Sequence, residues 1–344
     1  MTSYSSYDTY RRKKCLALVL GAFFILLLGF CSTTVGVMNT SPLDVPRAIW
    51  SWIDGSLEGN AAYKVIVLMR LPRTVLSILS GIGLAVAGVA MQGITSNPLV
   101  SPFTVGISNA AALGASLMIL FGGTLSTELG VIAGAFAMSL LCAGVVYLIS
   151  RSTGMKPETL ILVGTAFSYL FSASTSVLEI FADEHQLAEV VRWSFGTVNG
   201  ATWEQNLVIF LFVVSCSLVL LLLSPKLNIM MMGDDSLSLS MGVNTSALRT
   251  VVLLLSVLMT SAIISFTGVI GFVGLIAPHI GRSIIGEDNR YLLPFSAMLG
   301  AVLMLISDIA GRVVIAPAVL PVGIVISFLG VPMFLSLIWK RGRI

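Results

Sequence analysis

The chain has 344 residues, of which 56% are hydrophobic and 10% charged, and its mean hydropathy is +0.99. A soluble domain carries charge on about a quarter of its residues, so this composition excludes an ordinary soluble protein. The formal net charge is only +3, and the basic residues lie near the ends of apolar segments, which indicates membrane topology and argues against nucleic acid as a partner.

Apolar runs of about twenty residues predict bilayer-spanning helices, because the strands of a barrel would alternate apolar and polar residues. The sequence therefore predicts an all-α, polytopic membrane protein with about ten transmembrane helices in a single domain over 1–344. The predicted spans are 16–37, 66–93, 105–122, 128–149, 158–181, 204–224, 248–266, 268–284, 291–312 and 318–339.

The first and the eighth of these spans are unusual. The first follows a basic cluster and resembles the start of a signal peptide, but it is long and lacks a convincing small-residue cleavage site, so we expect a true first span. The eighth, 268–284, is short and begins at a Gly-rich turn. Both a full crossing and a broken or re-entrant segment remain open for it.

Lys and Arg indicate the orientation, because cytoplasmic loops are enriched in them. With a cytoplasmic N-terminal segment, 1–15, and ten crossings, thirteen basic residues fall on the cytoplasmic side and six on the outer side. This distribution predicts a multi-pass protein of the cell membrane with both termini in the cytoplasm.

A hydrophilic loop at 225–248, on the predicted cytoplasmic side, mixes polar and apolar residues at roughly helical spacing. This pattern predicts short helices that lie against a cytoplasmic partner. A solvated connector is the alternative, although a connector needs neither this length nor these Leu and Met residues. The residues of interest are Gly233, Asp234, Asp235, Leu237, Ser238, Met241 and Gly242.

The sequence lacks the residue patterns of most catalysts. It contains no GxxxxGK[ST] motif and no HExxH motif, and its four cysteines show neither CxxC spacing nor a Cys/His cluster. We therefore expect no enzyme activity in this chain, no metal site and no directly bound cofactor.

Small residues crowd several predicted spans, including Gly81 and Gly88 in the second. They favour close packing of helix backbones in lipid, which is general to polytopic proteins and indicates no substrate.

Ionisable groups inside spans are more informative, because burial in hydrocarbon costs them at least a few kcal/mol. Asp308 and Arg312 are four residues apart, so they face the same side of a helix and are expected to pair near its outer end. Arg70 and Arg73 open the second span from the outer side, which favours an acidic partner outside, with snorkelling at a span end as the alternative. For Gln92, near the inner end, helix contacts and cargo contacts both remain open.

Read together, these segments resemble the FecCD family of ABC permeases from about Arg70 to Trp339. The resemblance rests on the joint order and spacing of several motifs. They are Arg70-Leu71-Pro72-Arg73; Gly88 through Gln92-Gly93 and Asn97-Pro98-Leu99; Gly106-Ile107-Ser108; Trp193 with Gly196; Gly233 through Met241-Gly242; Gly268 through Leu275, with Pro278-His279 and Arg282; Asp308 with Arg312; Leu320-Pro321-Val322-Gly323; and Gly330-Val331-Pro332.

The resemblance implies a type II ABC importer permease fold of ten helices in a prokaryotic cell membrane, paired with a second permease copy or a paralogue. It implies that Arg70, Arg73 and Arg312 meet acidic residues of an extracytoplasmic substrate-binding protein. It also implies that the loop around 234–242 seats in a cytoplasmic ABC ATPase subunit. Gln92, Asn97, Pro98, Pro278, His279 and Asp308 remain structural or path-lining candidates.

The sequence thus predicts a permease subunit that moves a ferric siderophore, haem or cobalamin, with ATP hydrolysed by a separate subunit. An ion-gradient-driven secondary transporter is the alternative, although it would be expected to show carboxylates in mid-membrane, where Asp308 near a span end is the only strong candidate. The cargo itself is not readable, because family members that carry different chelates share these motifs.

Overall fold

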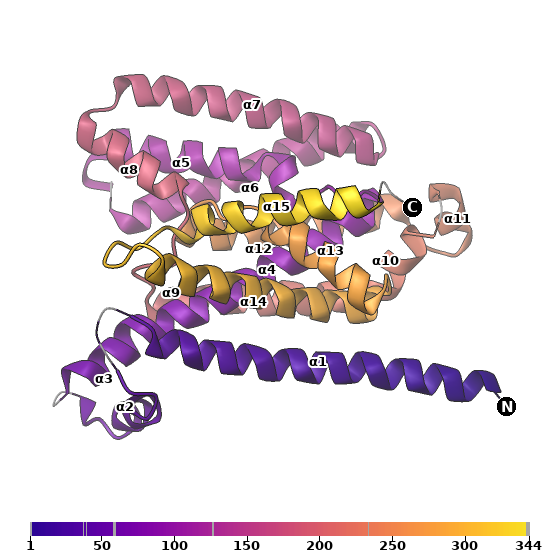
Figure 1. Cartoon of the computed structure of the whole chain (residues 1–344). Helices are drawn as coiled ribbons and strands as arrows, with labels where there is room; N and C mark the ends of the chain where they lie inside the picture. Colours follow the sequence, from indigo (N-terminus) through magenta and orange to yellow (C-terminus); the bar gives the residue numbers. More distant parts are fainter. Residues whose placement is uncertain are drawn as a thin grey trace.

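A computed structural model describes residues 2–36, 38, 40–57, 60–125, 127–232 and 234–341, and this part of the chain is predominantly helical, without strands. The long helices run side by side in one bundle (Figure 1). The α-helices are α1 Thr2–Thr34, α2 Asp44–Ile53, α3 Ala61–Val65, α4 Leu71–Thr95, α5 Ile107–Phe121, α6 Glu128–Ser152, α7 Pro157–Phe181, α8 Glu184–Ser194, α9 Trp203–Leu222, α10 Ser224–Met230, α11 Asp235–Ser240, α12 Thr245–Thr267, α13 Val273–Ile285, α14 Asn289–Val313 and α15 Val322–Arg341. A π-helix, η2 Ile66–Arg70, leads into α4, and short 3₁₀ helices occur at η3 Pro102–Val105 and η4 Gly123–Leu125.

The ten predicted spans each fall on one of these helices, which confirms the all-α membrane fold. Seven helices of the described residues are long and apolar enough to cross a membrane, and three shorter apolar helices complete the set. The shorter ones cover Ile107–Phe121, Val273–Ile285 and Val322–Met333.

The eighth predicted span is broken. Its helix, α13, has 13 residues and is therefore about 20 Å long, whereas the hydrocarbon core is about 30 Å thick. The preceding stretch from Gly268 is not helical, and Gly268 and Phe272 have φ angles of +70° and +65°. Such backbone is tolerated at membrane depth only inside protein. The connections at Gly196 and Gly323 pack against this stretch and are joined to each other and to the end of α12, from Gly323 N to Gly196 O at 3.1 Å and from Thr197 N to Thr267 O at 2.6 Å.

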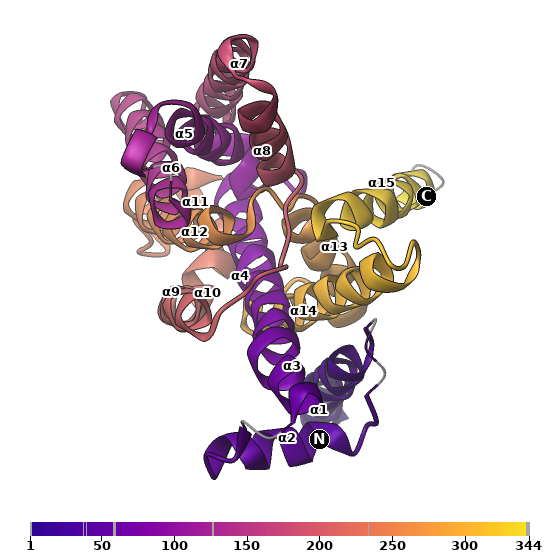
Figure 2. The same cartoon turned by 90° about the vertical axis from the view of Figure 1, so that its left-hand side faces the viewer.

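The core forms around α4, which lies in the middle of the bundle (Figure 2). Small residues allow other helices to approach its backbone. A Cβ atom at Gly81 would collide with the backbone of Gly300 in α14, and one at Gly88 would collide with the carbonyl of Gly274 in α13. The small face of the second predicted span therefore serves helix packing.

The two ends of the bundle differ. The N-terminus, the C-terminal part of α15 and the short helix α11 lie at one end, here called the α11 end, and α2, α3 and α8 lie at the other, called the α2 end (Figure 1). The peripheral helix α1 runs between them with most of its apolar side chains exposed.

Candidate functional site

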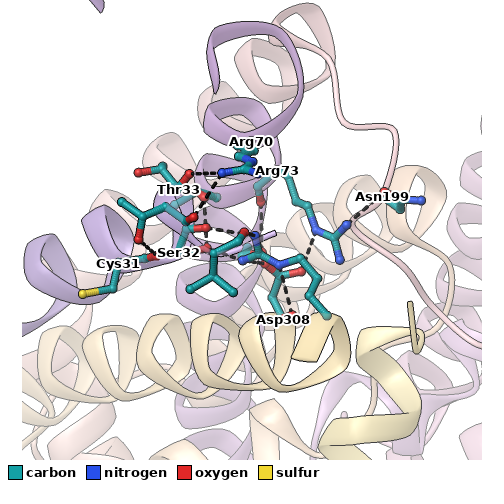
Figure 3. A network of polar contacts seen from close by, with 12 residues as sticks. Cys31, Ser32, Thr33, Arg70, Arg73, Asn199 and Asp308 are labelled. Atoms are coloured by element: carbon teal, nitrogen blue, oxygen red, sulfur yellow. Dashed lines mark hydrogen bonds and ion pairs between the residues drawn. The ribbon is translucent and has the colours of Figure 1, made fainter. Parts of the chain in front are cut away.

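Three arginines and one aspartate meet at the α2 end, where the π-helix η2 is followed by α4 and where α14 ends (Figure 3). Arg73 donates from Nε to Asp308 Oδ1 at 2.7 Å and from Nη1 to Asn199 Oδ1 at 2.9 Å. Arg312 donates from Nη2 to Asp308 Oδ2 at 2.7 Å. The predicted pair of Asp308 and Arg312 is confirmed, and the same carboxylate also binds Arg73.

Two of these arginines also bind the end of α1. Arg70 Nη1 donates to the carbonyls of Thr33 and Thr34, both at 3.1 Å, and Arg312 Nη1 donates to the carbonyl of Val35 at 2.7 Å. The last carbonyls of a helix lack intrahelical partners, and a cation near them is favourable. The arginines therefore fix the otherwise loosely packed α1 to α4 and α14.

The cluster is buried but borders open space. Arg70 and Arg73 are each 7% exposed, and Asp308 is fully buried. Arg70, Arg73 and Arg312 line a cavity of about 450 Å³ at the α2 end, together with the exposed loop residue Asn199. Three cations and one anion leave the cluster with a formal charge of +2, so the cavity favours an acidic group.

At the α11 end, the predicted short helices are α10 and α11. Asp234 caps α11, since its Oδ1 accepts hydrogen bonds from Ser236 Oγ at 2.8 Å and from Leu237 N at 3.1 Å. These hydrogen bonds lower the pKa of the Asp234 carboxyl. Gly242 closes the turn with a φ of +81°, and Ser238 is buried beneath it. Gly233 lies outside the described residues.

One arginine, Arg249 of α12, joins this loop to the bundle. Its Nη1 and Nη2 donate to both oxygens of Asp235 at 2.6 and 2.7 Å, and its Nε donates to the carbonyl of Ile94 at the end of α4. The hydrogen bonds from Arg249 lower the pKa of Asp235. Asp235 is among the residues predicted from the sequence, whereas its partner Arg249 is not. An arginine just inside an apolar span needs a partner, and that requirement was the available signal.

The surface of this loop is apolar. Four large side chains stand exposed on and beside α11: Met232, Leu237, Leu239 and Met241. Exposed apolar clusters of this kind mark a site of contact with another protein, a membrane or a ligand.

The remaining predicted residues join elements or shape turns. Gln92 accepts a hydrogen bond from Arg282 at 2.6 Å, so α4 and α13 are linked. Asn97 accepts from the Leu99 N–H at 3.0 Å, in the turn that also holds Pro98. Pro278 is buried inside α13, and His279 beside it is half-buried.

A second cavity, of about 620 Å³, opens on the side of the bundle between the end of α8, the stretch before α13 and helix α15. Its walls are mostly apolar and contain no titratable side chain. They are formed by Ser194, Phe195, Val269, Gly271, Gly323, Ile324, Ser327, Phe328, Val331 and Pro332. None of Gln92, Asn97, Pro278 and His279 lines it.

Known proteins share this architecture. The chain is 40% identical to a presumed ABC transporter permease of Methanocaldococcus jannaschii, over 97% of both chains. It is 36% identical to the hemin transport system permease of Yersinia pestis, over 94% of this chain and 96% of the relative. A solved inward-facing structure of a presumed metal-chelate type ABC transporter superposes with a TM-score of 0.82 and 31% identity, over 94% of this chain and 98% of that one.

The family relationship extends along the whole bundle, because residues 24–340 match the model of the FecCD transport family. Members are transport subunits that work with ATPase and substrate-binding subunits and are not enzymes themselves, so the ion-gradient alternative is not supported. The chain therefore belongs to the FecCD transport family and is a multi-pass permease subunit of an ABC importer.

Proposed function

We propose that this permease imports an iron chelate, a ferric siderophore or haem, and that cobalamin is the remaining cargo class. The observation that carries the proposal is the 620 Å³ cavity with mostly apolar walls. A chelate hides its metal behind organic groups, so a pathway for it needs room and weak contacts rather than metal ligands. The names of a hemin permease and of a metal-chelate transporter among the similar proteins support the same class.

A second permease, either another copy or a paralogue, would complete the path. The cavity opens on the side of the bundle, and its outer wall includes exposed apolar residues such as Phe328 and Val331. A pathway between two facing subunits would cover these side chains.

In the membrane, both termini and the α11 end would lie in the cytoplasm, and the α2 end would lie outside.

The cluster of Arg70, Arg73 and Arg312 would receive an acidic side chain of the binding protein. Its net charge and its position on the 450 Å³ cavity support this role. Reversing the buried arginines would disturb the fold, so the rim residue Asn199 gives the cleaner test. Asn199→Asp places a carboxylate beside Arg73, and we expect docking to weaken about tenfold, the effect of about 1.4 kcal/mol. Asn199→Ala is the matched control, and equal affinities of the two variants at low salt would contradict the docking role.

The exposed apolar surface of α11 would seat in the ATPase subunit. Met232, Leu237, Leu239 and Met241 suit a cleft on a cytoplasmic partner, and the capped helix holds them in place.

The import function is tested in proteoliposomes that contain the chain, its ATPase and its binding protein. Uptake of radioactive iron as a siderophore complex or as haem should require both ATP and the binding protein. Uptake by the purified chain alone under an ion gradient would contradict the proposal. The ligand that the purified binding protein retains would identify the cargo.

A further inference from the structure

The short helix α2 lies apart from the bundle core. It is seen nearly end-on in Figure 1 and along its length in Figure 2, so it runs across the bundle axis at the edge of the α2 end. None of the predicted helices includes these residues.

One face of α2 is packed against the protein. Val45 and Ala48 are buried in a small cluster with Ile66 and Val67 of η2. Trp52, which is 45% exposed, stacks on Trp203 with ring centroids 5.2 Å apart and an interplanar angle of 16°. Because these contacts involve both η2 and the start of α9, α2 is held in a fixed orientation.

The opposite face of α2 is apolar and uncovered. Leu43, which precedes the helix, is 64% exposed, Trp50 is 68% exposed and Ile53 is 72% exposed. Positions 43, 47, 50 and 53 recur at intervals of three or four residues, so they form one stripe along the helix. Arg47 is the charged member of this stripe and is also exposed.

The stripe lies close in sequence to a spanning helix whose own apolar surface is uncovered. The spanning helix α1 exposes Phe23, Leu26, Leu27 and Phe30, and it ends at Thr34, only ten residues before α2 begins. A helix that lies across the membrane normal at this level presents its exposed face to the headgroup region. Tryptophan is enriched at that depth, and arginine reaches from it to phosphate oxygens while its stem stays in apolar surroundings.

We propose that α2 is an interfacial helix, seated in the lipid headgroup layer at the α2 end through Leu43, Trp50 and Ile53, with Arg47 at the phosphates. In water the stripe would leave three large apolar side chains exposed. In the interface they are buried, and the helix lies in the membrane plane with one apolar face in lipid and the other on the protein. This role depends only on the chain spanning a bilayer, and not on its cargo or partners.

Tryptophan fluorescence of the full chain in lipid nanodiscs tests this role. Phosphatidylcholine with bromine atoms near the headgroup end of its acyl chains quenches tryptophans in the interface, and iodide quenches those in water. Subtracting the signal of Trp50→Phe from that of the unmodified chain isolates Trp50. The matched control is Trp52→Phe, since Trp52 lies about 200° around the same helix and stacks on Trp203.

A tryptophan in lipid is quenched mainly by bromolipid, whereas a tryptophan in water is quenched mainly by iodide. If α2 lies in the interface, bromolipid should quench Trp50 at least about twice as strongly as Trp52, and iodide should quench Trp50 less than bromolipid does. Stronger quenching by iodide would place the stripe in water and overturn the proposal. Weak quenching of Trp50 by both probes, with bromolipid quenching no stronger than that of Trp52, would mean that protein covers the stripe, either a second copy or the binding protein, and would also overturn it.

Discussion

Asp308 shows how far single residues can be predicted. Its pairing with Arg312 follows from a spacing of four residues on one helix, and this spacing can be read directly from the sequence. Its bond to Arg73 joins positions 235 residues apart, and nothing local in the sequence indicates that contact. The same holds for the carbonyls at the end of α1 that bind Arg70 and Arg312, because backbone acceptors have no sequence signal.

The first prediction concerns this carboxylate. Asp308→Asn removes the anion between two buried guanidinium groups and should destabilise the chain by about 3 kcal/mol, because an unpaired buried charge is costly. The measurement is thermal unfolding in detergent, compared with the unmodified chain. Glu184→Gln, an exposed acidic residue on α8, is the control and should change little. Equal melting of Asp308→Asn and the control would show that the cluster does not stabilise the fold.

At the scale of elements, the sequence located every long helix, because hydropathy windows depend on composition alone. For the eighth span it did not decide between a full crossing and a broken segment, and it did not predict α2. The break follows from Gly268 and its neighbours, whose conformation depends on connections far along the chain. The helix α2 was missed because its ten residues are about half of what a bilayer-spanning helix needs, so no hydropathy window of that length detects it.

The second prediction tests the close approach of α4 and α13. Gly88→Ala places a methyl group against the carbonyl of Gly274 and should destabilise the bundle by roughly 1–3 kcal/mol, as overpacking does. Gly144→Ala is the matched control, since a Cβ atom there meets nothing within 4 Å. Thermal unfolding of both variants measures the difference. Similar melting temperatures would mean that the helices can separate at little cost.

The third prediction concerns transmission from α11 to the bundle. Arg249→Ala disconnects Asp235 from the Ile94 carbonyl, while the apolar surface of α11 is left in place. In the assembled transporter, ATPase binding should persist, but stimulation of ATP hydrolysis by the binding protein should fall several-fold. Lys226→Ala, at an exposed position of α10, is the control. Unchanged stimulation in Arg249→Ala would exclude this link as part of the coupling.

The ion pair also has a defined pH dependence, which is the fourth prediction. The folded-state pKa of Asp235 is lowered, chiefly by its hydrogen bonds from Arg249, so the pair contributes stability above the unfolded-state value of about 3.9 and loses it as pH falls through the lower folded value. Amide exchange of α11 at pH 5 and 7, corrected for its intrinsic rate, should therefore match. Faster corrected exchange at pH 5 would contradict the lowered pKa.

On the scale of the whole molecule, α4 connects the two candidate partner surfaces. Arg73 near its first turn belongs to the cluster at the α2 end, and Ile94 near its last turn accepts from Arg249 at the α11 end. Because α4 is the most buried of the seven candidate spanning helices, we expect a displacement at either of its ends to move the helices packed on it. The sequence predicts both ends separately, but only the packed structure shows that one helix joins them.

The fifth prediction is the orientation of the molecule. The structure brings both termini and α11 to one end, and the basic residues favour the cytoplasm for that end, by thirteen to six. In a background with the exposed Cys15 and Cys31 replaced, His185→Cys on α8 should react with a membrane-impermeant maleimide in intact spheroplasts. Leu239→Cys on α11 is exposed and should react only after the membrane is opened, because the intact membrane keeps the maleimide out of the cytoplasm. The reverse pattern would invert the assignment: the arginine cluster would then face the ATPase side, where a substrate-binding protein has no access, and both proposed partner surfaces would lose their roles together.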